Sequence, residues 1–138
     1  MLPTQSQQAG AFRQFDLMRV PSPCFVVDAA KVRSNLRLLR SVRERTGTKI
    51  LSALKAFSMW KLAEVISEDL DGVCTSGLWE TRLAKAHYHG EITTYSAGYK
   101  TQDIDELAES SDHLIFNSAE SLKRFGPRVA ARGCSIGI

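Results

Sequence analysis

The residue whose surroundings most suggest chemistry is a lysine at position 55. It stands in "ILSALKAFSMW", residues 50–60, directly after an apolar run that is typical of a buried strand. Lysine is rarely buried completely. An amine that Leu54 and Phe57 keep partly away from water could act as a nucleophile or form a Schiff base. The alternative is a lysine at a strand end that reaches water, and spacing alone favours this second interpretation.

A second candidate is "SGLWE", residues 76–80, which also follows an expected strand. Small residues at a strand end leave room for a ligand to approach backbone N–H groups, so Ser76 is a candidate binding residue. The alternative is a tight turn in which Ser76 caps the next helix. Glu80, in the first turn of that helix, then only favours the helix dipole.

Two more stretches lie at the same topological place after later strands. In "YSAGYK", residues 95–100, Tyr95 and Tyr99 either line a pocket or belong to a plain loop. In "FNSAE", residues 116–120, helix capping is the simplest interpretation.

The composition excludes several other kinds of site. The three cysteines form no C-x-x-C pair and no histidine clusters with them, so we expect reduced thiols and no metal site. Arginines recur at helical spacing, which we interpret as a solvated helix face and not as a nucleic-acid-binding stripe; they are Arg33, Arg37, Arg40, Arg43 and Arg45. No apolar stretch of about 18 residues exists, so we expect no membrane span.

Strand and helix patterns alternate along the chain and must position these residues. Expected strands are 24–28, 49–54, 71–76, 91–96, 113–117 and 133–138. Expected helices begin at Asp28 and end at Gly47, then cover 60–68, 78–88, a segment from Thr101 or Asp103 through Leu107, and 119–125, which Ser118 caps. Such alternation predicts an α/β fold with a parallel sheet. The carboxyl ends of its strands would bring the candidate residues to one edge.

Even unit lengths, and the lack of a glycine-rich loop after the first strand, favour a TIM-like (β/α)₈ barrel over a doubly wound sheet. A complete barrel needs roughly 200–250 residues. With 138 residues, we expect the N-terminal part of a truncated barrel. Residues 1–20 are interpreted as a flexible leader, and 21–138 as a partial barrel domain.

Five stretches together resemble the carboxynorspermidine decarboxylases, a family of polyamine biosynthesis within the pyridoxal-phosphate-dependent fold that includes alanine racemase and ornithine and diaminopimelate decarboxylases. They are "PSPCFVVD", "ILSALKAFSMW", "LDGVCTSGLWETRLA", "TYSAGYK" and "DHLIFNSAESLKRF". The resemblance implies a barrel that carries pyridoxal 5'-phosphate and a C-terminal β domain, which we expect to be missing from this 138-residue chain. It also implies a cytoplasmic homodimer that acts on a small polyamine.

The resemblance assigns the cofactor-bonding lysine to Lys55, as both catalytic and cofactor-binding residue, and places Ser76 in the cofactor pocket. An acidic residue that ornithine and diaminopimelate decarboxylases carry early in the third-strand motif is missing from "VCTSG". Asp71 lies a few residues earlier, and the departure puts its role in doubt.

The implied activity is decarboxylation of carboxynorspermidine or carboxyspermidine to norspermidine or spermidine, and we expect the 138-residue piece to be inactive alone. The alternatives are a diaminopimelate-type decarboxylase and a non-catalytic pyridoxal-phosphate-binding protein of cofactor homeostasis. A truncated product that never folds stably is a third outcome, because unpaired strand edges invite aggregation.

Overall fold

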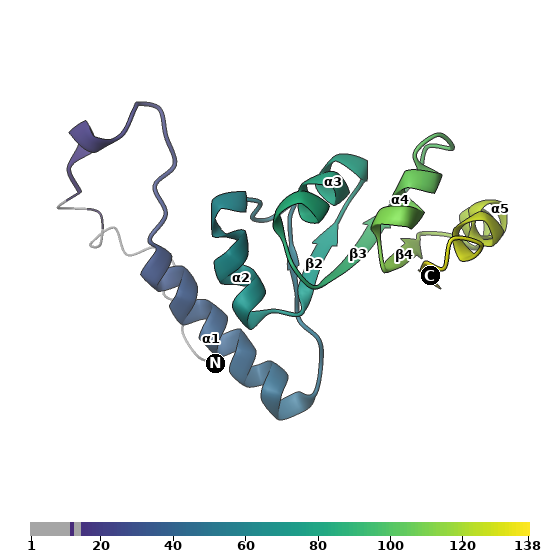
Figure 1. Cartoon of the computed structure of the whole chain (residues 1–138), viewed down its shortest axis with the longest axis horizontal. Coiled ribbons are helices and arrows are strands. Elements are labelled where there is room, and N and C mark those ends of the chain that lie inside the picture. The colour runs from purple at the N-terminus through teal and green to yellow at the C-terminus, as the bar shows by residue number, and fades with distance from the viewer. Residues whose placement is uncertain (1–11, 13–14) are drawn as a thin grey trace.

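The computed structural model describes residue 12 and residues 15–138. These residues form a five-stranded parallel sheet in the order β1-β2-β3-β4-β5, with a helix between successive strands (Figure 1). The strands are β1 (Leu51–Ala53), β2 (Gly72–Thr75), β3 (Glu91–Ser96), β4 (His113–Phe116) and β5 (Ser135–Gly137). The helices are η2 (Leu17–Arg19), α1 (Ala29–Thr46), η3 (Trp60–Leu62), α2 (Ala63–Asp69), α3 (Leu78–His87), α4 (Ile104–Ser110) and α5 (Ala119–Ala130).

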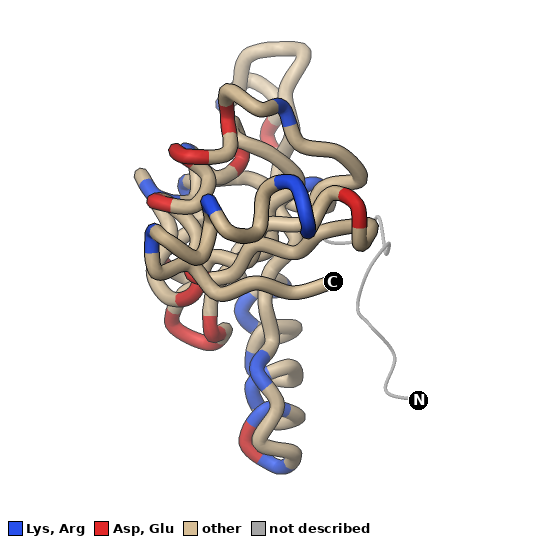
Figure 2. Tube along the Cα trace, turned by 90° about the vertical axis from the view of Figure 1, so that its right-hand side faces the viewer, with Lys and Arg blue, Asp and Glu red and all other residues tan. Residues whose placement is uncertain are grey.

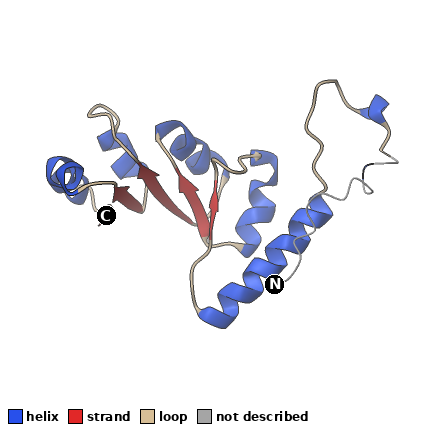
Figure 3. Cartoon of the chain, turned by 180° about the vertical axis from the view of Figure 1, so that it is seen from behind, coloured by secondary structure: helices blue, strands red, loops and turns tan. Residues whose placement is uncertain are grey.

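The helices after β1, from α2 to α5, all pack on the same face of the sheet (Figure 3). Val73 on β2 is in register with Ile92 on β3, and Leu114 on β4 is in register with Ile136 on β5. These apolar side chains all pack in the two clusters that lie under the helices. Because side chains alternate along a strand, the residues between them face the uncovered side.

The strand order and the one-sided placement of the helices decide between a doubly wound sheet and a barrel. A doubly wound sheet reverses its strand order so that helices cover both faces. Here the strands follow one another in chain order, and successive crossovers of one hand place every helix on one side. The α/β prediction is confirmed, and the sheet is built like a portion of a barrel wall.

Helix α1 begins and ends where the sequence predicts. The Asp28 side chain accepts hydrogen bonds from the N–H groups of Ala30 and Lys31, at 2.9 and 3.2 Å, and so caps the helix. At the other end Gly47 has a φ of 68°, a left-handed conformation that glycine adopts without strain.

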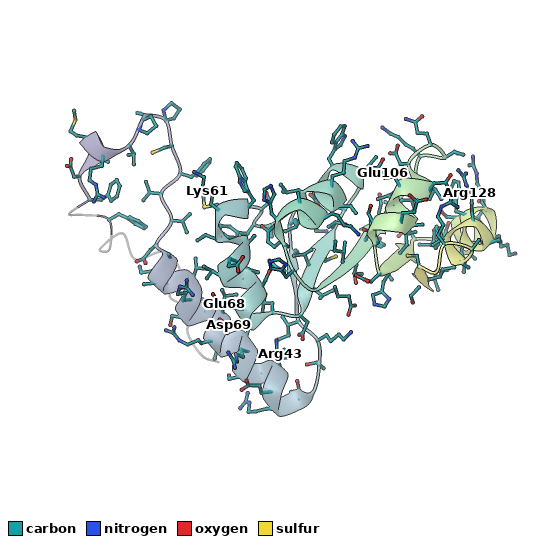
Figure 4. The ribbon with its side chains drawn as sticks, viewed as in Figure 1. Arg43, Lys61, Glu68, Asp69, Glu106 and Arg128 are labelled. Carbon is teal, nitrogen blue, oxygen red and sulfur yellow. The ribbon has the colours of Figure 1, made fainter. Side chains whose placement is uncertain are left out.

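The arginines of α1, visible as blue segments in Figure 2, do more than face water. Arg33 pairs with Glu68 of α2 at 3.0 Å. Arg43 donates to the carbonyl of Asp69 at 3.0 Å, and these residues are labelled in Figure 4. Arg33 stays exposed, as a solvated face requires, whereas Arg43 is partly buried because this face of α1 packs beside the acidic end of α2.

The strand predicted at 24–28 is absent, which corrects that expectation. The segment before Asp28 has no ladder partner among the described residues, and Phe25 is 95% exposed. Figure 1 shows it leading away from the sheet towards η2. A short apolar run becomes a strand only when a neighbour satisfies its backbone groups, and no described strand lies beside this one.

Three smaller findings complete the fold. None of the described helices is long and apolar enough to cross a membrane. Cys24, Cys74 and Cys134 are free thiols, of which Cys24 is exposed and Cys134 is buried. The leader predicted over 1–20 lies mostly outside the described residues.

Candidate active site

The candidate residues gather at one edge of the sheet. Lys55 lies in the turn after β1, Ser76 directly follows β2, and Asn117 directly follows β4. Tyr95 lies at the end of β3. Because all five strands are parallel, their carboxyl ends meet at this edge, where sites of parallel α/β folds assemble.

Lys55 projects from a closed turn. The N–H groups of Ala56 and Phe57 both donate to the Ala53 carbonyl, at 3.0 and 3.2 Å. Leu54 is 1% exposed and packs in the core under α2, whereas the neighbouring Lys55 is exposed. Within the described residues its amine has no hydrogen-bond or ion-pair partner, so it is free to form a bond with a ligand.

The charge of Lys55 acts on a thiol of the next strand. Burial raises the pKa of Cys74, the Lys55 ammonium lowers it by a smaller amount, and the Glu80 carboxylate raises it further. The amine, the thiol and the carboxylate therefore share one electrostatic neighbourhood. With its pKa raised overall, the Cys74 thiol adds no negative charge there at neutral pH.

Ser76 does not cap helix α3, so that simpler interpretation is wrong. The N-cap residue is Gly77, without a side-chain capping bond. Instead, the Ser76 N–H and Oγ both donate to Oε2 of Glu80, at 2.7 and 2.8 Å. Ser76 itself is exposed at the edge, and its two donors point towards one carboxylate oxygen.

Glu80 is the functional candidate that sequence reasoning missed. Its position in the first turn of α3 indicated only a dipole contact. The signal was present in the spacing, because residues four apart lie on one side of a helix start. The Glu80 carboxylate accepts both hydrogen bonds that Ser76 donates and so holds the Ser76 side chain at the end of β2.

The two tyrosines have different roles. Tyr99 donates to the Ile115 carbonyl at 2.8 Å and accepts from the Ser96 N–H at 3.0 Å, and burial raises its pKa to about 12. It pins the loop after β3. A cavity of about 240 Å³ beside it is lined in part by Ser76 and Tyr99. Tyr95 lies outside this lining and donates to Asn117 at 2.7 Å.

Two further expectations concern Asp71 and metal-ligating side chains. Asp71 lies at the amino end of β2, where it accepts from the Ile50 N–H at 2.9 Å and pairs with Arg43 at 3.4 Å. It is therefore at the opposite edge from Lys55. No cluster of three metal-ligating side chains occurs in the part of the chain that the structure describes.

Known proteins similar to this chain are decarboxylases. No protein-family model matches it. The carboxynorspermidine/carboxyspermidine decarboxylase of Campylobacter jejuni is 38% identical over 107 residues, which are 78% of this chain and 28% of that protein. The enzyme of the same name from Herminiimonas arsenicoxydans is 34% identical over 106 residues, 77% of this chain and 29% of that protein.

A third relative is the carboxyaminopropylagmatine decarboxylase of Synechocystis sp., 28% identical over 122 residues, 88% of this chain and 32% of that protein. The chain thus spans between 28% and 32% of the length of these curated relatives.

A solved structure agrees with the sequence matches. It is the crystal structure of carboxynorspermidine decarboxylase from Campylobacter jejuni complexed with norspermidine, with a TM-score of 0.78 and 37% identity. The match covers 80% of this chain and 30% of that chain. In sequence and in fold, this chain is therefore similar to the carboxynorspermidine decarboxylases over the part that it shares with them.

Proposed function

We propose that this chain supplies the lysine-bearing part of a carboxy-lyase that decarboxylates carboxynorspermidine or carboxyspermidine in polyamine biosynthesis. The observation that carries the proposal is Lys55 at the carboxyl edge of the parallel sheet, whose amine has no hydrogen-bond or ion-pair partner among the described residues. The chain is 34–38% identical to enzymes named for this reaction. These features together support an enzyme over a plain structural lysine.

Pyridoxal 5'-phosphate is the cofactor that the residues fit. Lys55 offers the free amine that would hold it, and the exposed Ser76 lies at the end of the neighbouring strand. When bound, the cofactor's ring withdraws the electrons left on the substrate carbon as carbon dioxide departs.

This chain's own residues contribute charge and position. The Lys55 amine would hold the cofactor, and once displaced it would be available to move a proton at the reacting carbon. Cys74 stays a neutral thiol, because burial raises its pKa. Glu80 holds Ser76 in place until a stronger anion competes for the same two donors.

The experiment that tests this function is a chimera. The matched segment of the Campylobacter jejuni enzyme is replaced by this chain, and carbon dioxide release is measured with carboxynorspermidine and carboxyspermidine. We expect activity with at least one substrate, and a loss of at least about a thousandfold in Lys55→Ala, because covalent catalysis depends on that amine.

Lys61→Ala is the matched control, since Lys61 is exposed on η3 a few residues away (Figure 4). A folded, cofactor-loaded chimera that releases no carbon dioxide, or one whose activity survives Lys55→Ala, would contradict the proposal.

A second substrate is favoured by one observation, the match to the carboxyaminopropylagmatine decarboxylase of Synechocystis sp. over 88% of this chain. Adding carboxyaminopropylagmatine to the same assay separates the two substrates. A cytoplasmic homodimer completes the proposal, and sedimentation of the chimera tests the dimer.

A further inference from the structure

A chain of buried hydroxyl groups runs beneath the candidate site. Its members are Thr75 on β2, Thr81 on α3, Thr94 on β3 and Ser111 after α4, and their exposed fractions are 1%, 0%, 0% and 9%. Buried hydroxyls are costly unless each finds a partner. In this structure, the hydroxyls form hydrogen bonds mostly with one another.

The contacts are short and they converge on one carbonyl. Oxygen–oxygen distances are 2.7 Å for Ser111–Thr94, 2.7 Å for Thr94–Thr75 and 2.8 Å for Thr75–Thr81. Thr81 Oγ1 then donates to the Gly77 carbonyl at 3.0 Å, and the Thr81 N–H donates to the same oxygen at 3.0 Å. Gly77 directly follows Ser76.

Counting hydrogens fixes the direction of the chain. Each hydroxyl has a single hydrogen, and that of Thr81 goes to the Gly77 carbonyl, which cannot donate. The Thr75 hydroxyl must therefore donate to Thr81, the Thr94 hydroxyl to Thr75, and the Ser111 hydroxyl to Thr94, if every contact of 2.8 Å or less holds a hydrogen. The remaining contact, Thr81–Thr94 at 3.1 Å, is the longest among the hydroxyls and is left without one.

A chain of this kind transmits a change along its length. Hydrogen bonds that point the same way polarise one another, so the loss of one donor weakens those after it. The chain crosses from the turn after α4, where Ser111 lines a cavity of about 320 Å³, to the turn after β2, where Ser76 stands. It links β2, β3 and the residue after α4 to the turn that presents a candidate cofactor residue.

We propose that Thr94 is a positioning residue that acts through Thr75 and Thr81 on the Gly77 carbonyl and thereby sets the orientation of Ser76. Thr94 touches neither Lys55 nor Ser76 in any contact that the structure gives. Its importance for pyridoxal phosphate rests on the proposed function, whereas the coupling to the turn does not. The coupling is therefore tested without the cofactor.

The test uses the uniformly ¹⁵N-labelled 138-residue chain and its amide NMR spectrum. Thr94→Val keeps the side-chain shape and removes the hydroxyl. We expect the Ser76 and Gly77 amide resonances to shift, and the Ser76 amide, which donates to Glu80, to exchange with solvent roughly fivefold faster, as the loss of about one net hydrogen bond predicts. Thr94→Ser, which keeps the hydroxyl, is expected to restore both signals.

Thr93→Val is the matched control, because Thr93 lies on the same strand and faces the uncovered side of the sheet. It should leave Ser76 and Gly77 unchanged. Shifts in Thr94→Val that stay among its direct neighbours, or equal shifts in Thr93→Val, would overturn the proposal.

If Thr94→Val does not fold, Ser111→Ala decides the matter. This variant removes the first donor of the chain at its least buried member, and we expect Ser76 and Gly77 to shift in the same direction by a smaller amount. Unmoved Ser76 and Gly77 resonances in a folded Ser111→Ala chain would refute the coupling. A failed decarboxylation assay would leave these spectra unaffected, so the two proposals fail independently.

Discussion

At the scale of single residues, the charges of Lys55 and Glu80 both influence the pKa of the Cys74 thiol. Lys55 and Glu80 act on Cys74 in opposite directions, while burial is the larger influence and raises the pKa of the thiol. The amine that we propose for catalysis can therefore be monitored through the reactivity of a neighbouring group. This requires no cofactor.

The charge balance predicts opposite effects of two substitutions on Cys74 alkylation. Lys55→Gln removes the charge that lowers the pKa of Cys74, so less thiolate forms and iodoacetamide should react more slowly, by roughly twofold or more at pH 8. Glu80→Gln should accelerate the reaction. Peptide mass spectrometry separates Cys74 from Cys24 and Cys134. Equal rates in both variants, or an equal change in Lys61→Gln, would show that the three groups do not interact.

At the scale of elements, carboxylates and arginines join the outer helices. Arg82 of α3 donates both Nε and Nη2 to Glu106 of α4. Arg128 of α5 makes a bidentate pair with Asp105 of α4, at 2.8 and 2.7 Å. Arg132 adds a third contact to Asp105, at 3.1 Å. Because these groups remain partly exposed and water screens them, we expect these ion pairs to add only modestly to the stability that helix packing provides.

The ion pair between Arg128 and Asp105 predicts an acid-dependent loss of folding stability. The hydrogen bond from Arg128 lowers the pKa of Asp105 below its ordinary value of 3.8. A carboxyl whose folded pKa is depressed contributes stability above its unfolded pKa and loses it as pH falls through the folded pKa. The decline therefore lies below about pH 4.

Urea denaturation of Asp105→Asn at pH 7 and pH 3 measures this contribution. We expect the variant to be less stable than the parent at pH 7 and to lose less stability on acidification. Glu120→Gln serves as the control, because Glu120 has no ion pair among the described residues. An identical pH dependence in the parent and in Asp105→Asn would contradict the prediction.

At the scale of the whole molecule, the sheet has one covered face and two open edges. β1 and β5 each pair on one side only, within the residues that the structure describes. Lys55 is exposed, and the two donors of Ser76 are occupied by Glu80. Among the residues that the structure describes, Lys55 thus presents its amine on an exposed surface.

From this exposure we predict that the 138-residue chain does not hold pyridoxal phosphate selectively by itself. Incubation with the cofactor, reduction by borohydride and peptide mapping should give similar labelling of Lys55 and of the exposed Lys61. The physical reason is that an amine in open water gains little from its neighbours. Selective labelling of Lys55 at micromolar cofactor would contradict the prediction and would show a pocket already formed.

Much of this molecule follows from local sequence. Helix α1 was predictable at both ends, because a capping aspartate and a left-handed glycine act within a few residues of themselves. Lys55 was correctly placed beyond a strand, and the strand–helix alternation correctly predicted a parallel sheet. Periodicity and capping are short-range effects, so a single sequence carries them.

Only the tertiary structure decided the rest. The apolar segment 24–28 resembles a strand but has no partner within the described residues, since pairing depends on distant backbone. Other contacts likewise depend on where separate elements meet. These are the contacts of Arg43, the hydrogen bonds from Ser76 to Glu80 and the chain of hydroxyl groups. The sequence by itself determined which residues could do chemistry, and the packing of β2, β3 and α3 determined which of them touch, because hydrogen bonds between elements are set by three-dimensional geometry that no local pattern encodes.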